Sequence, residues 1–202
     1  RRQVVDLHVV IEDSLKLLRA TLPAMMHIES KFQSDLPAIA VDVTQIHQII
    51  MNLATNAAHA IGDAPGVLEV AVDAVSVRPE EVTAADLHSG HYVRITVSDN
   101  GCGMDRTTVE RIFDPFFTTK PPGQGTGLGL SVVHGIVRSH DGAVRVYSQP
   151  GKGTTFRIYL PVGGRAAMDD ASEAGAEARG AGEHVMYIDD EESLVFLGKR
   201  VL

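Results

Sequence analysis

The residues between Lys120 and Leu130 are the stretch of this chain whose types and spacing favour chemistry most clearly. Glycines stand there at every second position: Gly123, Gly125, Gly127 and Gly129. Alternating glycines weaken both strands and helices, so we predict a loop whose backbone N–H groups approach a ligand closely. The apolar run 128–137 predicts a helix directly afterwards, and free N–H groups at a helix N-terminus favour an anion such as phosphate. A flexible surface linker is the alternative interpretation.

Better-known glycine motifs are excluded by position. Gly151 and Lys152 are followed by Gly153 rather than by Ser or Thr, which excludes a P-loop. The dinucleotide fingerprint G-x-G-x-x-G does not occur, and Ser131 lacks the closing glycine of a hydrolase nucleophile elbow. A phosphate at the glycine stretch would therefore be bound by another scheme.

Three polar residues share one flank of a second predicted helix, residues 46–61. Asn52, Asn56 and His59 are spaced i, i+4 and i+7, so their side chains point the same way. Amide oxygens suit Mg²⁺, which takes its remaining ligands from phosphates and water. The alternative is that both asparagines cap neighbouring loops or face water.

A carboxylate, Asp99, stands at the end of a predicted strand and just before a tight turn, Asn100–Gly103. An ionised carboxylate only accepts hydrogen bonds, so it suits the N6 amine of adenine and repels the O6 carbonyl of guanine. An ordinary Asp-Asn-Gly turn is the competing interpretation. The next segment, Phe113–Lys120, predicts either a hinged cover with an aromatic anchor or an aromatic patch that staples a long loop.

Periodicity predicts the elements that must position these residues. Residues 7–22 favour a helix that Pro23 ends, and Arg1–Gln3 are interpreted as the tail of something upstream. Asp42 and Gln45 have capping-box spacing before the asparagine helix, whose predicted buried stripe is Ile46, Ile49, Ile50, Leu53, Ala57 and Ile61 and whose end is Gly62. The predicted strands are 26–33, an antiparallel pair at 67–77 and 91–98 joined by a polar connection, and a hairpin of 143–148 with 154–160.

Composition limits the class of protein. The 202 residues are 44% hydrophobic and 22% charged, which describes a soluble globular domain with additional material. The net charge of -8 argues against a basic nucleic-acid-binding surface, and no window has the apolar length of a membrane span. The single cysteine, Cys102, fits a reducing compartment.

Five motifs in this order resemble the N, G1, F, G2 and G3 boxes of the ATP-binding domains of sensor histidine kinases. They are Asn52–Ala57, Asp99–Gly103, Phe113–Phe117, Gly125–Leu130 and Gly151–Phe156. The resemblance covers residues 1–162 and implies a Bergerat (GHKL) fold, a two-layer α/β sandwich with helices on one face of a mixed sheet.

The same resemblance implies the ligands and their residues. ATP would lie between the asparagine helix and a lid, Met104–Gly123; Asp99 would bind adenine with help from the Gly101–Gly103 turn and Thr154. Asn56 would ligate Mg²⁺, with Asn52 and His59 near the phosphates and Lys120 able to reach one. The phosphates would meet the N–H groups of the glycine loop: Gly125, Thr126, Gly127, Leu128 and Gly129.

The rest of the chain is predicted as a flexible linker, residues 163–183, and the truncated start of a receiver domain, residues 184–202, with an acidic pair at Asp189 and Asp190. These features imply a cytoplasmic catalytic domain of a hybrid histidine kinase, with an upstream helical phosphoacceptor and dimerisation domain and a homodimeric parent. Only His140 is followed by an acid, and its context does not match an acceptor, so self-labelling is not expected. A gated ATPase of the same fold and a non-catalytic ATP-sensing module are the alternatives; because Asn52 stands where the hydrolysing relatives have a glutamate base, efficient hydrolysis is disfavoured.

Overall fold

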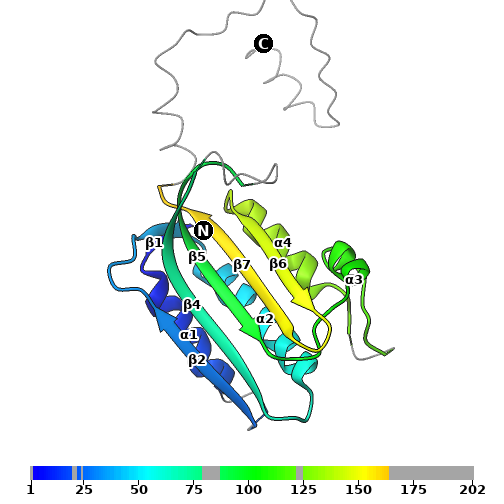
Figure 1. Cartoon of the computed structure of the whole chain (residues 1–202). Coiled ribbons are helices and arrows are strands. Elements are labelled where there is room, and N and C mark those ends of the chain that lie inside the picture. Colours follow the sequence, from blue (N-terminus) through cyan, green and yellow to red (C-terminus); the bar gives the residue numbers. More distant parts are fainter. Residues whose placement is uncertain (1, 20–21, 24, 79–86, 122–124, 164–202) are drawn as a thin grey trace, which may run out of the picture. The chain divides into compact units, whose positions relative to one another are not determined.

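A mixed five-stranded sheet forms one layer of the domain (Figure 1). The computed structural model describes residues 2–19, 22–23, 25–78, 87–121 and 125–163. In spatial order the strands are β2 (Met26–Phe32), β4 (Gly66–Val77), β5 (Gly90–Asp99), β7 (Gly153–Pro161) and β6 (Ala143–Gln149). β2 pairs with β4 in parallel and every other pair is antiparallel, so the sheet is mixed.

Three helices cover one face of this sheet (Figure 1). They are α1 (Leu7–Arg19), α2 (Val43–Ile61) and α4 (Gly129–Ser139), and a short helix, α3 (Arg106–Arg111), lies beside β6. α2 packs against both α1 and α4 and lies over β4 and β5. The predicted two-layer α/β architecture is therefore confirmed.

Alternation along the strands places the core between the two layers. Leu68, Val70 and Val72 of β4 are buried, and Val70 lies opposite Val97 of β5. The helices contribute their apolar stripes to the same cluster: Leu7, Ile11, Leu15, Leu18, Ile46, Ile49, Ile50, Leu53, Ala57, Val133, Ile136 and Val137. Burying apolar side chains of this size contributes about 1.5–3 kcal/mol each, so the core holds the sheet and helices in a fixed relation.

The ends of α2 follow the predicted capping residues. The Asp42 carboxylate accepts hydrogen bonds from the N–H groups of Thr44 and Gln45, so the helix begins at Val43, three residues before the predicted start. Gly62, at φ 67°, ends it. Five of the six predicted stripe residues are buried; Ile61 is half-buried because it lies at the last turn, beside Gly66.

The N-terminal segment differs from the prediction. β1 (Gln3–Val5) pairs antiparallel with β3 (Ile39–Val41), so Gln3 belongs to a two-stranded sheet rather than to a tail. Three-residue strands carry too little alternation to be seen in the sequence. Arg2 anchors the same segment to the end of α4, with Nη1 lying 3.3 Å from the Asp141 carboxylate.

The predicted linker and receiver segments lie outside the described residues, apart from Gly163. Much of the connection between β4 and β5, residues 79–86, also lies outside them. Within the part of the chain that the structure describes, no helix has both the length and the apolar character needed to cross a bilayer.

Candidate nucleotide site

The asparagine flank of α2 faces a cation supplied by the chain itself. Asn52 and Asn56 are half-buried and His59 is exposed on the same flank. Lys120, from the segment after the phenylalanines, donates from Nζ to Oδ1 of Asn56 at 3.3 Å. The amide oxygen of Asn56 is therefore already directed at a positive charge, as a metal-ligating oxygen must be.

The two basic groups near this flank have shifted pKa values. Burial lowers the pKa of Lys120, because desolvation disfavours the ammonium form. Burial, and then the nearby charge of Lys120, lowers the pKa of His59. Both shifts describe a place where a further negative charge would be stabilised, since phosphate oxygens would favour the charged form of each group.

The glycine loop leads from Lys120 to the N-terminus of α4. The helix begins after Leu128 without a side-chain cap, which leaves its first-turn N–H groups available to a ligand. A methyl group on Gly129 would lie 3.3 Å from Oδ1 of Asn52, so the start of α4 adjoins the asparagine flank. The loop and the asparagines, far apart in sequence, are brought together as predicted.

Gly127 is required by the backbone contact that it makes with the phenylalanine segment. Its φ of 66° disfavours any side chain, and a methyl group would collide with the backbone of Phe116. The carbonyl of Gly127 accepts a hydrogen bond from the Phe116 N–H at 3.0 Å. This glycine therefore serves contact with the chain itself, whereas the sequence suggested contact with a ligand.

Asp99 ends β5 beside Thr154 of β7, its partner in the register of the two strands. Its carboxylate accepts a hydrogen bond from the Gly101 N–H at 2.9 Å, and the Thr154 N–H also stabilises the charged form. Burial nevertheless dominates and raises the pKa of Asp99. A half-buried carboxylate at a strand end, with lone pairs remaining, can accept an amino group of a ligand.

The turn after Asp99 is fixed to α2 and to the β6–β7 hairpin. The Cys102 N–H donates to the Ala60 carbonyl at 2.9 Å, and the Gly151 N–H donates to the Cys102 carbonyl at 2.7 Å. A methyl group on Gly101 would lie 2.7 Å from Ala60, and one on Gly103 would collide with the Gln149 carbonyl. Gly101 and Gly103 thus let helix, turn and hairpin meet beside Asp99.

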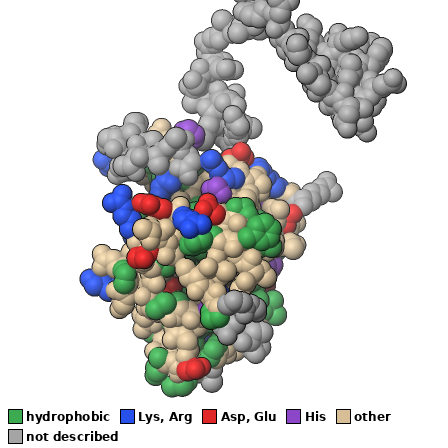
Figure 2. Space-filling model, turned by 90° about the vertical axis from the view of Figure 1, so that its right-hand side faces the viewer, with side chains coloured by type: hydrophobic (Ala, Val, Ile, Leu, Met, Phe, Trp, Pro, Cys, Tyr) green, Lys and Arg blue, Asp and Glu red, His purple; other side chains and the backbone are tan. Residues whose placement is uncertain are grey.

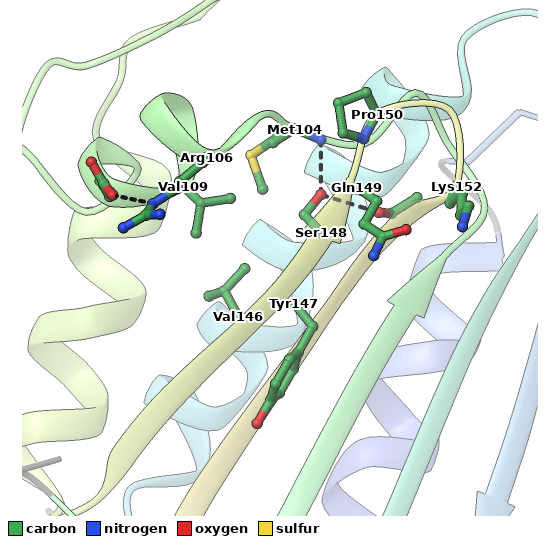
Figure 3. Close-up of a pocket in the computed structure, with 11 residues that line it drawn as sticks. Met104, Arg106, Val109, Val146, Tyr147, Ser148, Gln149, Pro150 and Lys152 are labelled. Atoms are coloured by element: carbon green, nitrogen blue, oxygen red, sulfur yellow. Dashed lines mark hydrogen bonds and ion pairs between the residues drawn. The ribbon is translucent and has the colours of Figure 1, made fainter. Parts of the chain in front are cut away.

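Ser148, on β6, is a residue of this site that the sequence reasoning missed. Its hydroxyl donates to the Gly153 carbonyl at 3.1 Å and accepts the Met104 N–H at 2.8 Å (Figure 3). It also lies 2.9 Å from Oγ1 of the buried Thr154. Asn100 was also missed: its side chain accepts the Val67 N–H at 2.8 Å and ties the turn to β4. Ser148 lies in none of the five motifs, and Asn100 lies within Asp99–Gly103 without a predicted role, so only the hydrogen bonds identify what they do.

In the phenylalanine segment, Phe113 and Phe117 fit the predicted aromatic patch, whereas Phe116 fits the predicted exposed cover. Phe113 packs on the ring of His134 with centroids 5.1 Å apart, and the guanidinium of Arg111 lies 4.5 Å from the Phe117 ring centroid. These two rings therefore staple the segment to the core. Phe116 is 74% exposed and has a positive φ of 66°, so it presents an apolar ring to solvent.

A groove of about 620 Å³ lies beside the Asp99 end of the site, between α3 and the β6–β7 hairpin (Figure 3). Met104, Val109, Val146 and Pro150 give it apolar walls, while Lys152 stands at its rim. Its lining does not include Asn52, Asn56 or Lys120, the residues predicted to lie near phosphates. On the surface drawn in Figure 2, basic and acidic side chains are interspersed rather than gathered into one basic field.

Most predicted residues meet around one region. One side of it consists of the residues predicted to meet phosphates, Asn52, Asn56, His59, Lys120 and Gly125–Gly129, and the other of Asp99, Gly101, Gly103 and Thr154. Thr126 takes part through its hydroxyl, which accepts the Leu128 N–H at 3.3 Å. Gly123 lies outside the described residues.

The sequence matches the profile of a known family. The profile of the histidine kinase-, DNA gyrase B- and HSP90-like ATPases matches residues 41–164, from just before α2 to just beyond β7. The chain belongs to this ATPase family. Membership of this ATPase family implies that the domain binds ATP.

Named relatives are sensor kinases. The chain is 33% identical to sensor kinase CckA of Brucella abortus over all of its own length and 22% of the relative, and 41% identical to sensor histidine kinase ZraS of Escherichia coli over 79% of its own length and 31% of the relative. The solved structure of full-length ShkA in complex with AMPPNP is also similar, with a TM-score of 0.63 and 26% identity. The match covers 79% of this chain and 31% of the ShkA chain. The chain thus spans about a fifth to a third of the length of these relatives.

Proposed function

We propose that this chain is the Mg-ATP-binding catalytic domain of a sensor histidine kinase, which transfers the γ-phosphoryl group of ATP to a histidine of an upstream helical dimerisation domain. The observation that carries the proposal is that Asn52 adjoins the uncapped start of α4 while Asn56, on the same flank of α2, faces the ammonium of Lys120. An amide flank, a helix N-terminus and a nearby lysine together favour a metal-bound polyphosphate. The sensor-kinase names of the relatives support the same class of protein.

The residues of this chain would divide the work of binding. Asp99 accepts the adenine amine, aided by Thr154, while Asn52, His59, Lys120 and the N–H groups of Gly125–Gly129 hold the phosphates. Asn56 would ligate Mg²⁺ through Oδ1, which already faces a cation in Lys120. When bound, the ion supplies neutralisation of phosphate charge. Among the described residues no group of three or more His, Cys, Asp or Glu is arranged for a metal, so the remaining ligands would come from phosphates and water.

The chemistry favours a histidine acceptor over water. Asn52 lies one helical turn before Asn56, and an amide cannot take the proton of an attacking water. A neutral imidazole needs no such base, because its unprotonated nitrogen is already a nucleophile. Catalysis would then consist of positioning and charge stabilisation, which this site provides. A gated ATPase is therefore the less favoured function.

The acceptor histidine would come from outside the chain. His140, the only histidine followed by an acid, is buried and both of its ring nitrogens are engaged, so it has no free nitrogen for phosphoryl transfer. Exposed apolar side chains adjoin the site instead: Met51 on α2, Phe116 and Leu128. We expect them to contact the upstream helices, in a parent that is a homodimer acting in the cytoplasm.

The proposal extends to the residues beyond the ATPase domain. Residues 163–183 would be a linker and residues 184–202 the start of a receiver domain, with Asp189 and Asp190 as its acidic pair. The match to the relative CckA covers the whole length of this chain, including residues 163–202, which supports a kinase context for this segment as well.

The decisive experiment mixes ATP labelled at the γ-phosphoryl group with this chain, alone and with the upstream segment of its parent protein. Label should appear on a histidine of the upstream segment and on none in this chain. An Asn56→Ala variant should lose the transfer, while Thr55→Ala, an exposed neighbour on the same helix, should keep it. Label on a histidine of this chain, or steady phosphate release without an acceptor, would contradict the proposal.

A further inference from the structure

His140, the residue after α4, joins two helices through both nitrogens of a buried ring. Nδ1 lies 2.9 Å from the Ile136 carbonyl oxygen, and Nε2 lies 3.0 Å from the backbone nitrogen of Asp42. A carbonyl only accepts and a backbone N–H only donates. The ring is therefore the neutral tautomer that donates from Nδ1 and accepts the Asp42 N–H at Nε2.

The bond closes one end of an antiparallel pair of helices. Asp42 is the N-cap residue of α2, so His140 ties the C-terminal end of α4 to the start of α2. At the other end of α4, Gly129 adjoins Asn52 of α2. At 1.5 Å per residue, Asp42 to Asn52 spans about 15 Å and Gly129 to His140 about 16 Å, so the two links stand at matching separations.

Those two helices carry the phosphate side of the nucleotide site. α2 supplies Asn52 and Asn56, and α4 supplies the uncapped N–H groups. A helix that slides or tilts along its neighbour moves both of its ends, so the link at His140 limits the position of the N–H groups relative to the asparagines. The Asp99 side depends instead on β5, β7 and the turn bonded to Ala60.

We propose that His140 is a positioning residue for the phosphates of ATP: its hydrogen bond from the Asp42 N–H sets the start of α4 against Asn52 and Asn56. The inference rests on the proposed function and deepens it. It predicts that a change at His140 acts on ligands that carry phosphates and spares the adenosine part, although the ring contacts no ligand.

A matched pair of variants of the full 202-residue chain tests the role of Nε2. Glutamine and methionine have the same length, but only glutamine has an oxygen that can accept the Asp42 N–H. Calorimetry would measure the affinities for Mg-AMPPNP and for adenosine. His140→Met should weaken the affinity for Mg-AMPPNP about tenfold, which corresponds to about 1.4 kcal/mol. It should leave the affinity for adenosine within about twofold of the parent value.

His140→Gln should restore most of the Mg-AMPPNP affinity. His47→Met serves as the control, because His47 of α2 bonds Ser14 of α1 away from α4, and it should bind both ligands like the parent chain. Equal loss of both ligands in His140→Met would mean a general effect on folding and would overturn the inference, as would a glutamine variant that behaves like methionine. Failure of the unaltered chain to bind Mg-AMPPNP would instead refute the proposed function, and the inference with it.

Discussion

Replacing Asp99 by asparagine should move nucleotide affinity and the stability of the empty domain in opposite directions. The change keeps the shape of the side chain and exchanges one acceptor oxygen for a donor. A hydrogen bond to a charged group contributes about 1.5–3 kcal/mol, so the affinity for ATP should fall roughly 10- to 150-fold. The preference for ATP over GTP should fall too, because the new donor no longer repels the guanine O6.

Stability should respond differently because burial raises the pKa of Asp99. A raised pKa means that the folded state disfavours the ionised carboxylate, so its contribution to stability is present below the unfolded pKa and is lost as pH rises through the folded pKa. Asp99→Asn removes this pH dependence. The variant without nucleotide should therefore be at least as stable as the parent near pH 7 and should lose this advantage near pH 3.

Calorimetric affinities for ATP and GTP and urea unfolding at both pH values would check these expectations. Asp63→Asn makes the same chemical change at an exposed position beyond α2 and should alter neither quantity. An unchanged ratio of ATP to GTP affinity would refute the adenine role of Asp99. A loss of stability at pH 7 that persists at pH 3 would refute the argument from burial.

Two further predictions concern the phosphate side. Burial and Lys120 lower the pKa of His59, so bound phosphates should raise that pKa and cause proton uptake. The affinity for Mg-ATP should then rise more between pH 7.5 and pH 6 in the parent chain than in His59→Gln. Equal pH dependence of affinity in the two proteins would contradict this. Gly127→Ala should destabilise the domain by roughly 1–3 kcal/mol in urea unfolding, because φ is 66° and a methyl group has no room. Gly135→Ala, inside α4 with open space around it, should instead stabilise by roughly 0.5–1 kcal/mol, and a Gly127→Ala variant that is also stabilised would show that the contact with Phe116 is unimportant.

The sequence predicted those parts of the fold that depend on local chemistry and periodicity. Asp42 and Gly62 marked the ends of α2, and alternation marked β4 and β5, because caps and side-chain faces are properties of neighbouring residues. β1 and β3 were missed, because a three-residue pair is stabilised by partners 34 or more positions apart in the chain, Val5 with Ile39 being one such pair.

The candidate site was predictable to the same extent. Five spaced motifs predicted most of the site residues, since glycines and the asparagines on one flank of a helix form a recognisable pattern. The hydrogen bonds between the motifs leave no such pattern in the sequence. Ser148, Ala60 and His140 act through hydrogen bonds to backbone groups of distant segments, and any residue type can supply a backbone partner. The sequence therefore indicates the groups proposed to meet the ligand more readily than those that set their positions.

The two sides of the site owe their geometry to different forces, and this difference bears on how ATP binds. Asp99 and Thr154 lie on adjacent strands whose register is fixed by the ladder of the sheet. Asn56, by contrast, is satisfied by the ammonium of Lys120, a long side chain whose conformation is only weakly restricted. In the proposed binding mode, adenine would therefore meet a surface that already exists, whereas Mg²⁺ would have to replace the Lys120 ammonium at Oδ1 of Asn56. Recognition of the base should accordingly depend on the sheet. The affinity added by Mg²⁺ and the phosphates should depend on the release of Lys120 from Asn56 and on the link between His140 and Asp42 that joins α4 to α2.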